Sequence, residues 1–245
     1  MTKTLILLAS FLLAPNLPAA DAGLGLSTQP SAAEIVDRML HADLARASQL
    51  EGYTATRVYR LVNPRFRKQA QITARITYRR PGEKSFEVVS EEGSHLICER
   101  VLRRVIGAET DASKDSNRDQ ARINLVNYDL KMLGTEAKEG RTFYVLELEP
   151  KSKSPYLVKG RAWIDATEYA LVRMEGTVAK KPSIWVGSPV VTQTYSRSGP
   201  FWLPERNFST TDAPVFGKTD LSIESTSYEV RRGVAAEPLA GRIGN

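Results

Sequence analysis

The sequence contains very little of the chemistry that metal sites and nucleophilic enzymes need. Its 245 residues include one cysteine, Cys98, and two histidines, His41 and His95. A single cysteine excludes an internal disulfide, so the hydrophobic core must hold the fold. His95 and Cys98 stand three apart on an expected helix, but two ligands do not complete a metal site. A Cys–His nucleophile would also lack an orienting partner. We therefore expect no metal and read the pair as a surface histidine beside a buried cysteine.

Motifs that bind phosphates or activate a serine are also missing. The chain has no G-x-G-x-x-G and no P-loop. Ser188 follows a glycine but lacks the second glycine of a nucleophile elbow. Carboxylates on strand faces could serve glycoside hydrolysis, although solvated strand faces are the more ordinary explanation. The sequence therefore predicts no catalytic residues, no cofactor and no enzymatic activity.

After the first two dozen residues, no apolar stretch approaches the length that spans a bilayer. The start itself is a short basic segment, an apolar run at residues 5–14 and small residues at 16–22. This order is typical of a secretory signal peptide; the alternative is an uncleaved anchor. We expect residues 1–22 to be a signal peptide cleaved near 20–22 and residues 23–30 to be a flexible leader. The mature protein is then expected to be periplasmic.

Charge of one sign is not concentrated anywhere in the chain. The formal net charge is +6, and its basic residues are scattered apart from short clusters such as residues 65–68. A surplus of this kind fits attraction to anionic lipid headgroups. It does not favour nucleic acid as a partner.

The regular structure begins at residue 31. Ser31 and Glu34 form a capping box, which predicts a helix from residue 32 to about 50. Its apolar residues fall on one stripe, which must pack on another element. The stripe consists of Ile35, Val36, Met39, Leu40 and Leu44.

Most of the remaining chain alternates apolar and polar residues with a period of two. The hairpin at residues 159–176 shows this pattern, with Ala170, Val172 and Met174 expected on its apolar face. About ten such strands follow one another with short turns. The fold class is therefore mainly β with α: one strongly curved antiparallel sheet, a half-open barrel of roughly 10–11 strands. We assign residues 31–232 to this single domain and residues 233–245 to a disordered tail.

The strand pattern is interrupted at residues 94–106, where apolar residues return at helical spacing. The polar stretch 109–120 that follows predicts a mobile loop or a short irregular helix. A helix inserted into a meander could be a lid over one end of the sheet or could be packed permanently on an open edge. The expected lid residues are Leu96, Ile97, Val101, Leu102, Val105 and Ile106.

A barrel of this width tends to enclose a ligand cavity rather than fill with side chains. We expect its wall to be apolar, although ordinary core is the alternative for each residue. The expected wall consists of Ile72, Ala74, Ile76, Tyr78, Val88, Trp163, Val172, Met174, Leu221 and Ile223.

This order of elements resembles the LolA/LolB-like family of outer-membrane lipoprotein-sorting proteins, over roughly residues 32–230. Local residues that support the resemblance are 79–82 with Phe86, 127–129, 163–165 with 171–173, and 202–204. The family implies a half-open barrel with a helical lid and a cavity for acyl chains. It also implies a strand arginine that clasps the lid, for which Arg57 and Arg60 are the candidates.

Two functions follow as hypotheses. The first is a periplasmic, non-catalytic carrier of the acyl chains of lipids or lipoproteins, expected to be a monomer, with membrane-bound donor and acceptor proteins as partners. The second is a structural, sensor or protein-interaction module that has the same fold and a filled core.

Overall fold

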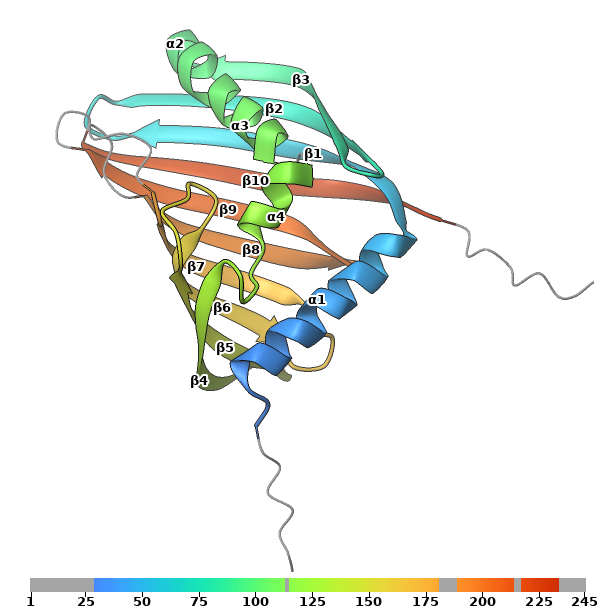
Figure 1. Ribbon diagram of the computed structural model, residues 1–245. Helices are drawn as coiled ribbons and strands as arrows, with labels where there is room; N and C mark the ends of the chain where they lie inside the picture. Colours follow the sequence, from blue (N-terminus) through green and yellow to red (C-terminus); the bar gives the residue numbers. More distant parts are fainter. Residues whose placement is uncertain (1–28, 113–114, 181–188, 214–216, 234–245) are drawn as a thin grey trace, which may run out of the picture.

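The computed structural model describes residues 29–112, 115–180, 189–213 and 217–233. Within these ranges the chain forms one ten-stranded antiparallel sheet with helices on one side of it (Figure 1). The expected signal peptide, most of the leader, Ser188 and nearly all of the expected tail lie outside the described residues. The expected mainly-β fold with a strongly curved, unclosed sheet is confirmed.

The strands account for most of the described chain. They are β1 (Leu50–Asn63), β2 (Lys68–Arg79), β3 (Glu83–Gly93), β4 (Tyr128–Lys138), β5 (Arg141–Pro150), β6 (Val158–Asp165), β7 (Leu171–Val178), β8 (Val190–Ser198), β9 (Phe201–Ala213) and β10 (Gly217–Arg232). The helices are α1 (Ala32–Gln49), α2 (His95–Ile97), the π-helical turn η1 (Cys98–Leu102), α3 (Arg103–Ala112) and α4 (Asp115–Ala121).

The order of strands in the sheet is β3-β2-β1-β10-β9-β8-β7-β6-β5-β4, and every neighbouring pair is antiparallel. β3 and β4 are therefore the two edges, although they are consecutive strands in the chain. The segment between them, residues 94–127, has to cross from one edge to the other. We call its helical part, α2 to α4, the insertion.

The capping box expected at the start of α1 is present. Glu34 donates its backbone N–H to the Ser31 hydroxyl over 3.2 Å, and Ser31 donates its own N–H to the Glu34 carboxylate over 2.8 Å. These reciprocal bonds satisfy two backbone donors that a helix start otherwise leaves free. The local sequence thus fixes where α1 begins.

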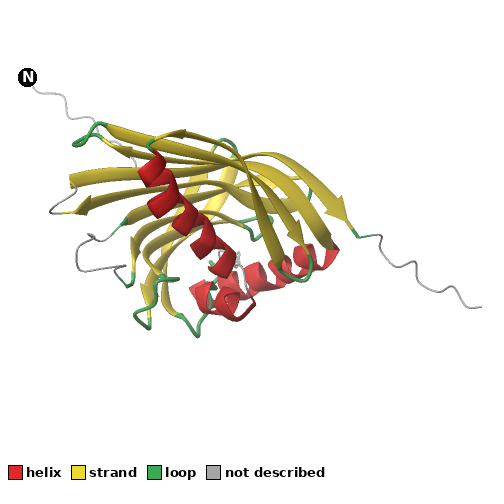
Figure 2. Ribbon diagram, turned by 90° about the horizontal axis from the view of Figure 1, so that it is seen from above, coloured by secondary structure: helices red, strands yellow, loops and turns green. Residues whose placement is uncertain are grey.

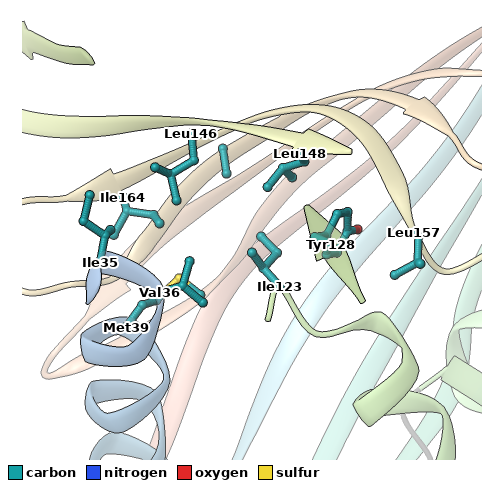
Figure 3. Close-up of a cluster of buried hydrophobic side chains, with 10 residues drawn as sticks. Ile35, Val36, Met39, Ile123, Tyr128, Leu146, Leu148, Leu157 and Ile164 are labelled. Atoms are coloured by element: carbon teal, nitrogen blue, oxygen red, sulfur yellow. The ribbon is translucent and has the colours of Figure 1, made fainter. Parts of the chain in front are cut away.

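The apolar stripe of α1 packs against the β4–β7 half of the sheet as far as Leu40, but Leu44, which was expected on the same stripe, is 57% exposed. Ile35, Val36 and Met39 are buried in a cluster with strand residues of that half (Figure 3). The other buried members of the cluster are Ile123, Tyr128, Leu146, Leu148, Leu157, Ala162 and Ile164.

The insertion packs against the other half of the sheet, over β1 and β2. Cys98, Leu102 and Ile106 of the insertion are buried against strand residues. Their buried strand partners are Tyr59, Leu61, Ala70, Ile72 and Ala74.

Both helical covers lie on the same face of the sheet. One row of paired residues crosses this face from β2 to β4, nine of the ten strands: Ile72, Tyr59, Ile223, Asn207, Gln193, Met174, Ala162, Leu146 and Met132. Members of the row belong to the α1 cluster at one end and to the insertion cluster at the other. This face is the concave one, around which the sheet curves (Figure 2). The row is polar in its middle, at Asn207 and Gln193, between the two covers.

Two one-residue insertions displace the side-chain pattern expected from the sequence. In η1 the backbone forms a π-helical turn at Cys98–Leu102, which adds a residue to the helical repeat. In β7 a bulge places Leu171 opposite Ile164 and Arg173 opposite Trp163, so that Val172 is the extra residue.

The bulge corrects the expected face of the hairpin. Leu171 and Met174, rather than Val172 and Met174, pack against the α1 cluster. The expectation of a loop or irregular helix at residues 109–120 is also corrected in part, because α3 continues to Ala112 and α4 follows from Asp115.

Candidate functional site

Several residues expected to line a cavity are instead buried against other side chains in this structure. Ile72, Ala74 and Ile76 of β2 are 0% exposed. Ile72 and Ala74 lie in the insertion cluster, which Leu221 and Ile223 also contact as half-buried neighbours. Ile76 belongs to a third cluster with Tyr53, Ala55, Phe201 and Leu203. Ile72 and Ala74 are therefore part of the floor beneath the insertion, whereas Ile76 is not.

The remaining wall residues are not gathered with these. Met174 contacts the α1 cluster at the far half of the sheet. Tyr78 stacks on Tyr53 with their ring centroids 5.1 Å apart, near the end of the sheet where α1 joins β1. Val88 pairs with Ala74 on the edge strand β3 and remains 36% exposed.

Trp163 and Val172 do not belong to the concave wall. Trp163 follows Ala162, which faces the α1 cluster, so its ring lies on the convex face. There its indole N–H donates to the Glu136 carboxylate over 2.7 Å and Arg173 stacks on the ring at 4.8 Å. The structure therefore corrects the expectation that Trp163 is part of the cavity wall.

The expected lid residues divide between the two sides of the insertion. Leu102 and Ile106 are buried, and Ile97 and Val105 pack as half-buried neighbours of the same cluster. Leu96 and Val101 are exposed, by 58% and 38%. The underside of the insertion therefore consists of Ile97, Cys98, Leu102, Val105 and Ile106.

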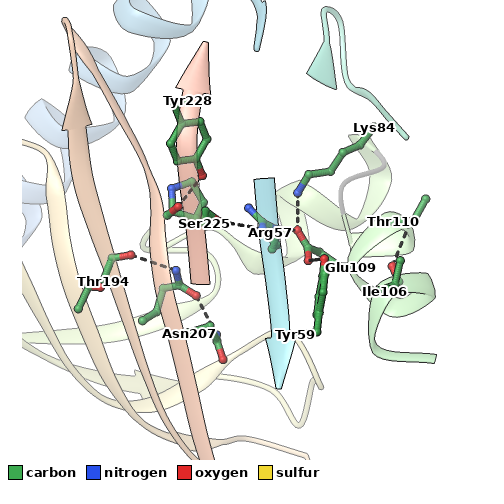
Figure 4. Close-up of polar contacts among 12 residues, drawn as sticks. Arg57, Tyr59, Lys84, Ile106, Glu109, Thr110, Thr194, Asn207, Ser225 and Tyr228 are labelled. Atoms are coloured by element: carbon green, nitrogen blue, oxygen red, sulfur yellow. Dashed lines mark hydrogen bonds and ion pairs between the residues drawn. The ribbon is translucent and has the colours of Figure 1, made fainter. Parts of the chain in front are cut away.

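Glu109 of α3 attaches the insertion to the sheet by polar contacts. Its carboxylate accepts hydrogen bonds from Arg57 Nη1, from the Tyr59 hydroxyl over 2.8 Å and from Lys84 Nζ over 2.6 Å (Figure 4). Arg57 and Tyr59 come from β1, and Lys84 comes from β3. We call Glu109 and these three donors the latch.

The latch is an ion-pair site with little access to water. The side chains of Arg57, Lys84 and Glu109 are 4%, 10% and 21% exposed. Burial acts to raise the pKa of Glu109, but Lys84 and Arg57 outweigh it and hold that pKa below its usual value. Burial lowers the pKa of Lys84, and burial together with the Glu109 carboxylate raises that of Tyr59. Glu109 is therefore the group whose charge the site depends on.

Arg57 is fixed from both sides but not fully satisfied. Its Nε donates to the Ser225 hydroxyl of β10 over 2.8 Å, while Nη1 donates to Glu109. Its Nη2 is buried and has no hydrogen-bond partner among the described residues. An unpaired buried donor on a charged group costs free energy, so this atom needs an explanation.

Arg60, the other clasp candidate, is placed differently. It follows Tyr59 on β1 and so lies on the opposite face, where its guanidinium donates to the Gln71 side chain over 3.0 and 3.1 Å. Of the two candidates, Arg57 contacts the insertion and Arg60 does not.

A cavity of about 190 Å³ lies beside the latch, in the middle of the concave face. Its size leaves room for about six water molecules, below the range of typical ligand pockets. Most of the residues that line it are polar or charged, and they come from β1, β8, β9, β10 and α3. It consists of Arg57, Glu109, Gln193, Tyr195, Pro204, Glu205, Arg206, Asn207, Ile223 and Ser225.

Sequence reasoning missed Tyr59, Lys84 and Glu109. The sequence carries one signal on β1 and one on α3. Arg57 stands in the apolar phase of β1, between Ala55 and Tyr59, which indicates a buried charge in need of a partner. Glu109 stands seven residues after Leu102 and so shares its face of the helix.

No candidate metal site or membrane-spanning helix emerges from the described parts of the chain. No three His, Cys, Asp or Glu side chains there gather closely enough to hold a metal ion. None of the described helices has the length and apolarity needed to cross a membrane.

Three comparisons with known proteins were made. No family model matches the chain, and no curated protein matches it. Among solved structures, the chain resembles a LolA superfamily protein from Nitrosomonas europaea at 14% identity and a TM-score of 0.38, over 83% of this chain and 94% of that one. It also resembles an outer membrane lipoprotein-sorting protein domain from Vibrio parahaemolyticus at 13% identity and a TM-score of 0.39, over 82% and 94%. Both neighbours carry names from the LolA/LolB-like group of proteins that the sequence resembles.

Proposed function

We propose that this protein is a periplasmic, non-catalytic carrier that binds the acyl chains of lipids or lipoproteins beneath the insertion. The observation that carries the proposal is the apolar contact between the underside of the insertion and the concave face of β1 and β2. A cover with an apolar underside over an apolar floor provides two surfaces between which an acyl chain can lie.

The hydrophobic free energy of the closed insertion is comparable with that of an insertion displaced by a bound acyl chain. Burial of one aliphatic side chain contributes roughly 2 kcal/mol, and burial of one methylene contributes about 0.8 kcal/mol. Ten methylenes of an acyl chain therefore offset the exposure of about four side chains of the underside. Displacement of the insertion by an acyl chain is energetically feasible without disruption of the sheet.

The attachment of the insertion is compatible with opening. Its described residues form no strand pairs with the sheet, and its most buried ion pairs with the sheet are those of the latch around Glu109. A second ion pair, from Arg103 to Glu91 of β3, is more exposed and therefore weaker. Release of the latch would leave this exposed ion pair, the weak thiol contacts of Cys98, and apolar contacts that an acyl chain can replace.

The setting of the carrier is part of the same proposal. The N-terminal sequence is that of a signal peptide, and the net charge of +6 favours approach to anionic membrane surfaces. Membrane-bound donor and acceptor proteins would deliver and receive the acyl chains.

A second function is favoured by a specific observation. Ile72, Ala74 and Ile76 are fully buried, and the cavity on the concave face is small and polar. A permanently filled core of this kind suits a structural, sensor or protein-interaction module. The two functions differ in whether the insertion leaves the sheet.

Native mass spectrometry and thermal unfolding test the proposal. Protein exported in its own host should carry bound lipid, and palmitoyl lysophosphatidylglycerol should raise its Tm in a saturable way. If the exported protein carries no lipid and the lysolipid leaves Tm unchanged, the carrier function is wrong and the filled-core module remains.

A further inference from the structure

The latch contains more positive than negative charge. Arg57 and Lys84 both pair with the single carboxylate of Glu109, and both bind the same oxygen, Oε1. Two cations and one anion leave a net positive charge in a site with little access to water. A buried charge without a counter-charge is costly, so the site favours a further anion.

The other charged groups of the cavity do not supply that anion. Glu205 is exposed and accepts a surface hydrogen bond from Thr194 over 3.2 Å. Arg206 is exposed as well and pairs with Glu224 of β10 at 3.1 Å. Arg57 is the charged cavity residue that is both deeply buried and left with an unpaired donor, its Nη2.

The neutral lining suits the polar end of a ligand. Ser225 and Asn207 contribute a hydroxyl and an amide, and the Asn207 amide donates to Gln193 over 2.7 Å. These three side chains lie between the two helical covers, so the cavity is the part of the concave face that neither apolar cluster fills. In Figure 4, Arg57 extends between Ser225 on one side and Glu109 on the other.

We propose that this polar cavity binds a phosphate or carboxylate group, which takes Nη2 of Arg57 and competes with Glu109 for Nη1. A guanidinium can bind such a group through two parallel N–H donors. Glu109 accepts from only one of them, Nη1. As the anion enters, Glu109 withdraws and the insertion loses its buried polar attachment. The anion is either a free ion or the headgroup of an amphiphile, and in the second case the inference rests on the proposed carrier function.

The latch variants separate this site from a structural ion pair. Affinity for inorganic phosphate, measured by isothermal titration calorimetry, should fall at least tenfold in Arg57→Gln and rise several-fold in Glu109→Gln. The rise is expected because the competing carboxylate is gone while both cations remain. Arg60→Gln, which changes an arginine on the opposite face, is the matched control and should bind phosphate like the wild type.

A merely structural ion pair would weaken binding in both variants or leave phosphate unbound throughout. Either result overturns the proposal, and the Glu109→Gln result keeps it testable even if Arg57→Gln does not fold.

Amphiphiles of equal chain length identify the source of the anion. If the headgroup is the ligand, palmitoyl lysophosphatidylglycerol should bind at least tenfold more tightly than monopalmitoylglycerol, and Glu109→Gln should widen the difference. Phosphate binding without a preference between the amphiphiles supports the site with a free ion as its ligand. Equal binding of both amphiphiles with no phosphate binding overturns the anion site and leaves the carrier function standing. Phosphate binding with no amphiphile binding supports the anion site and overturns the carrier function.

Discussion

At the scale of single residues, the charge of Glu109 governs how the insertion is held. Arg57 and Lys84 donate to its carboxylate together with the Tyr59 hydroxyl, and the two cations outweigh burial and lower its pKa. A carboxylate whose pKa is lower in the folded state contributes stability above its unfolded pKa, near 4.3. That contribution is lost as the pH falls through the lower, folded value.

The first prediction concerns this pH dependence. At neutral pH, Glu109→Gln should reduce the free energy of unfolding by about 1–3 kcal/mol, because the charge-assisted bonds are lost. The deficit should be constant above about pH 5 and should shrink as the pH falls below about 4, where the carboxyl is protonated first in the unfolded chain and then, below its lowered folded pKa, in the folded protein. Urea unfolding at a series of pH values measures it.

The matched control for this prediction is Glu99→Gln. Glu99 is an exposed carboxylate of the same insertion that pairs with Arg103, and its replacement should cost little at any pH. A Glu109→Gln deficit that persists undiminished to pH 3 would contradict the assigned role of the charge.

The residues of the latch also show where sequence reasoning reaches and where it stops. Arg57 was a clasp candidate from the resemblance, and its position in the apolar phase of β1 agrees with a buried role. Its partner could not be found, because Glu109 is 52 residues from Arg57 in the chain and 25 residues from Lys84. Only the path of the insertion across the sheet brings them together.

At the scale of elements, the sequence predicted which side chains of a helix or strand face the core, up to the point where the backbone accommodates one extra residue. The π-helical turn η1 and the bulge in β7 each add one residue to a regular repeat. Neither needs a glycine or proline, so the sequence carries no mark of them. The capping box of α1, by contrast, depends on two residue types at fixed spacing and was predicted correctly.

The second prediction follows from the phase that η1 imposes. Leu102 and Val101 are adjacent apolar residues, but Leu102 is 0% exposed and Val101 is 38% exposed. Leu102→Ala should reduce the free energy of unfolding by about 2–4 kcal/mol, since it leaves a cavity under the insertion. Val101→Ala should change it by less than about 0.5 kcal/mol. Equal losses in urea unfolding would mean that the insertion does not pack on the sheet in this phase.

The third prediction concerns the close approach of β6 and β7 at a pair of opposed glycines. A Cβ on Gly160 would lie 2.0 Å from the carbonyl oxygen of Glu175 and 2.6 Å from the Cα of Gly176. These are backbone atoms that cannot move without separating the strands, so Gly160→Ala should lower the free energy of unfolding by about 1–3 kcal/mol.

Gly107 of α3 is the control for that substitution. A Cβ there meets nothing within 4 Å, and alanine favours a helix over glycine by roughly 0.5–1 kcal/mol. Gly107→Ala should therefore stabilise the protein. If both alanine variants shift the urea midpoint in the same direction, the close approach at Gly160 is not a constraint.

At the scale of the whole molecule, the topology makes the insertion a bridge over the concave face. β3 and β4 are consecutive in the chain but lie at opposite edges of the sheet, and the insertion connects them. The sequence predicted both the number of strands and the inserted helix. It could not predict which strands are the edges, because that depends on the pairing of β1 with β10 between residues far apart in the chain.

The single cysteine of the chain is a natural reporter on this bridge. Cys98 is 0% exposed, and its Sγ lies 3.8 Å from the carbonyl oxygen of Gln71 and 3.7 Å from that of Glu92. Burial raises the pKa of its thiol, which further suppresses its reaction in the closed state. A thiol reagent should therefore reach Cys98 only when the insertion lifts from β2 and β3 or when the protein unfolds.

The last prediction uses this reporter to distinguish the carrier from the filled-core module. If the insertion opens locally, Cys98 should react faster than global unfolding permits, and its rate should depend only weakly on urea, because little surface is exposed. Glu109→Gln should raise the rate in the absence of urea by roughly tenfold, since it removes the buried polar attachment, whereas Glu99→Gln should not. A labelling rate that follows the urea dependence of global unfolding in all three proteins would instead mean that the insertion is a permanent part of the core. The acyl chain would then have no route to the floor formed by β1 and β2.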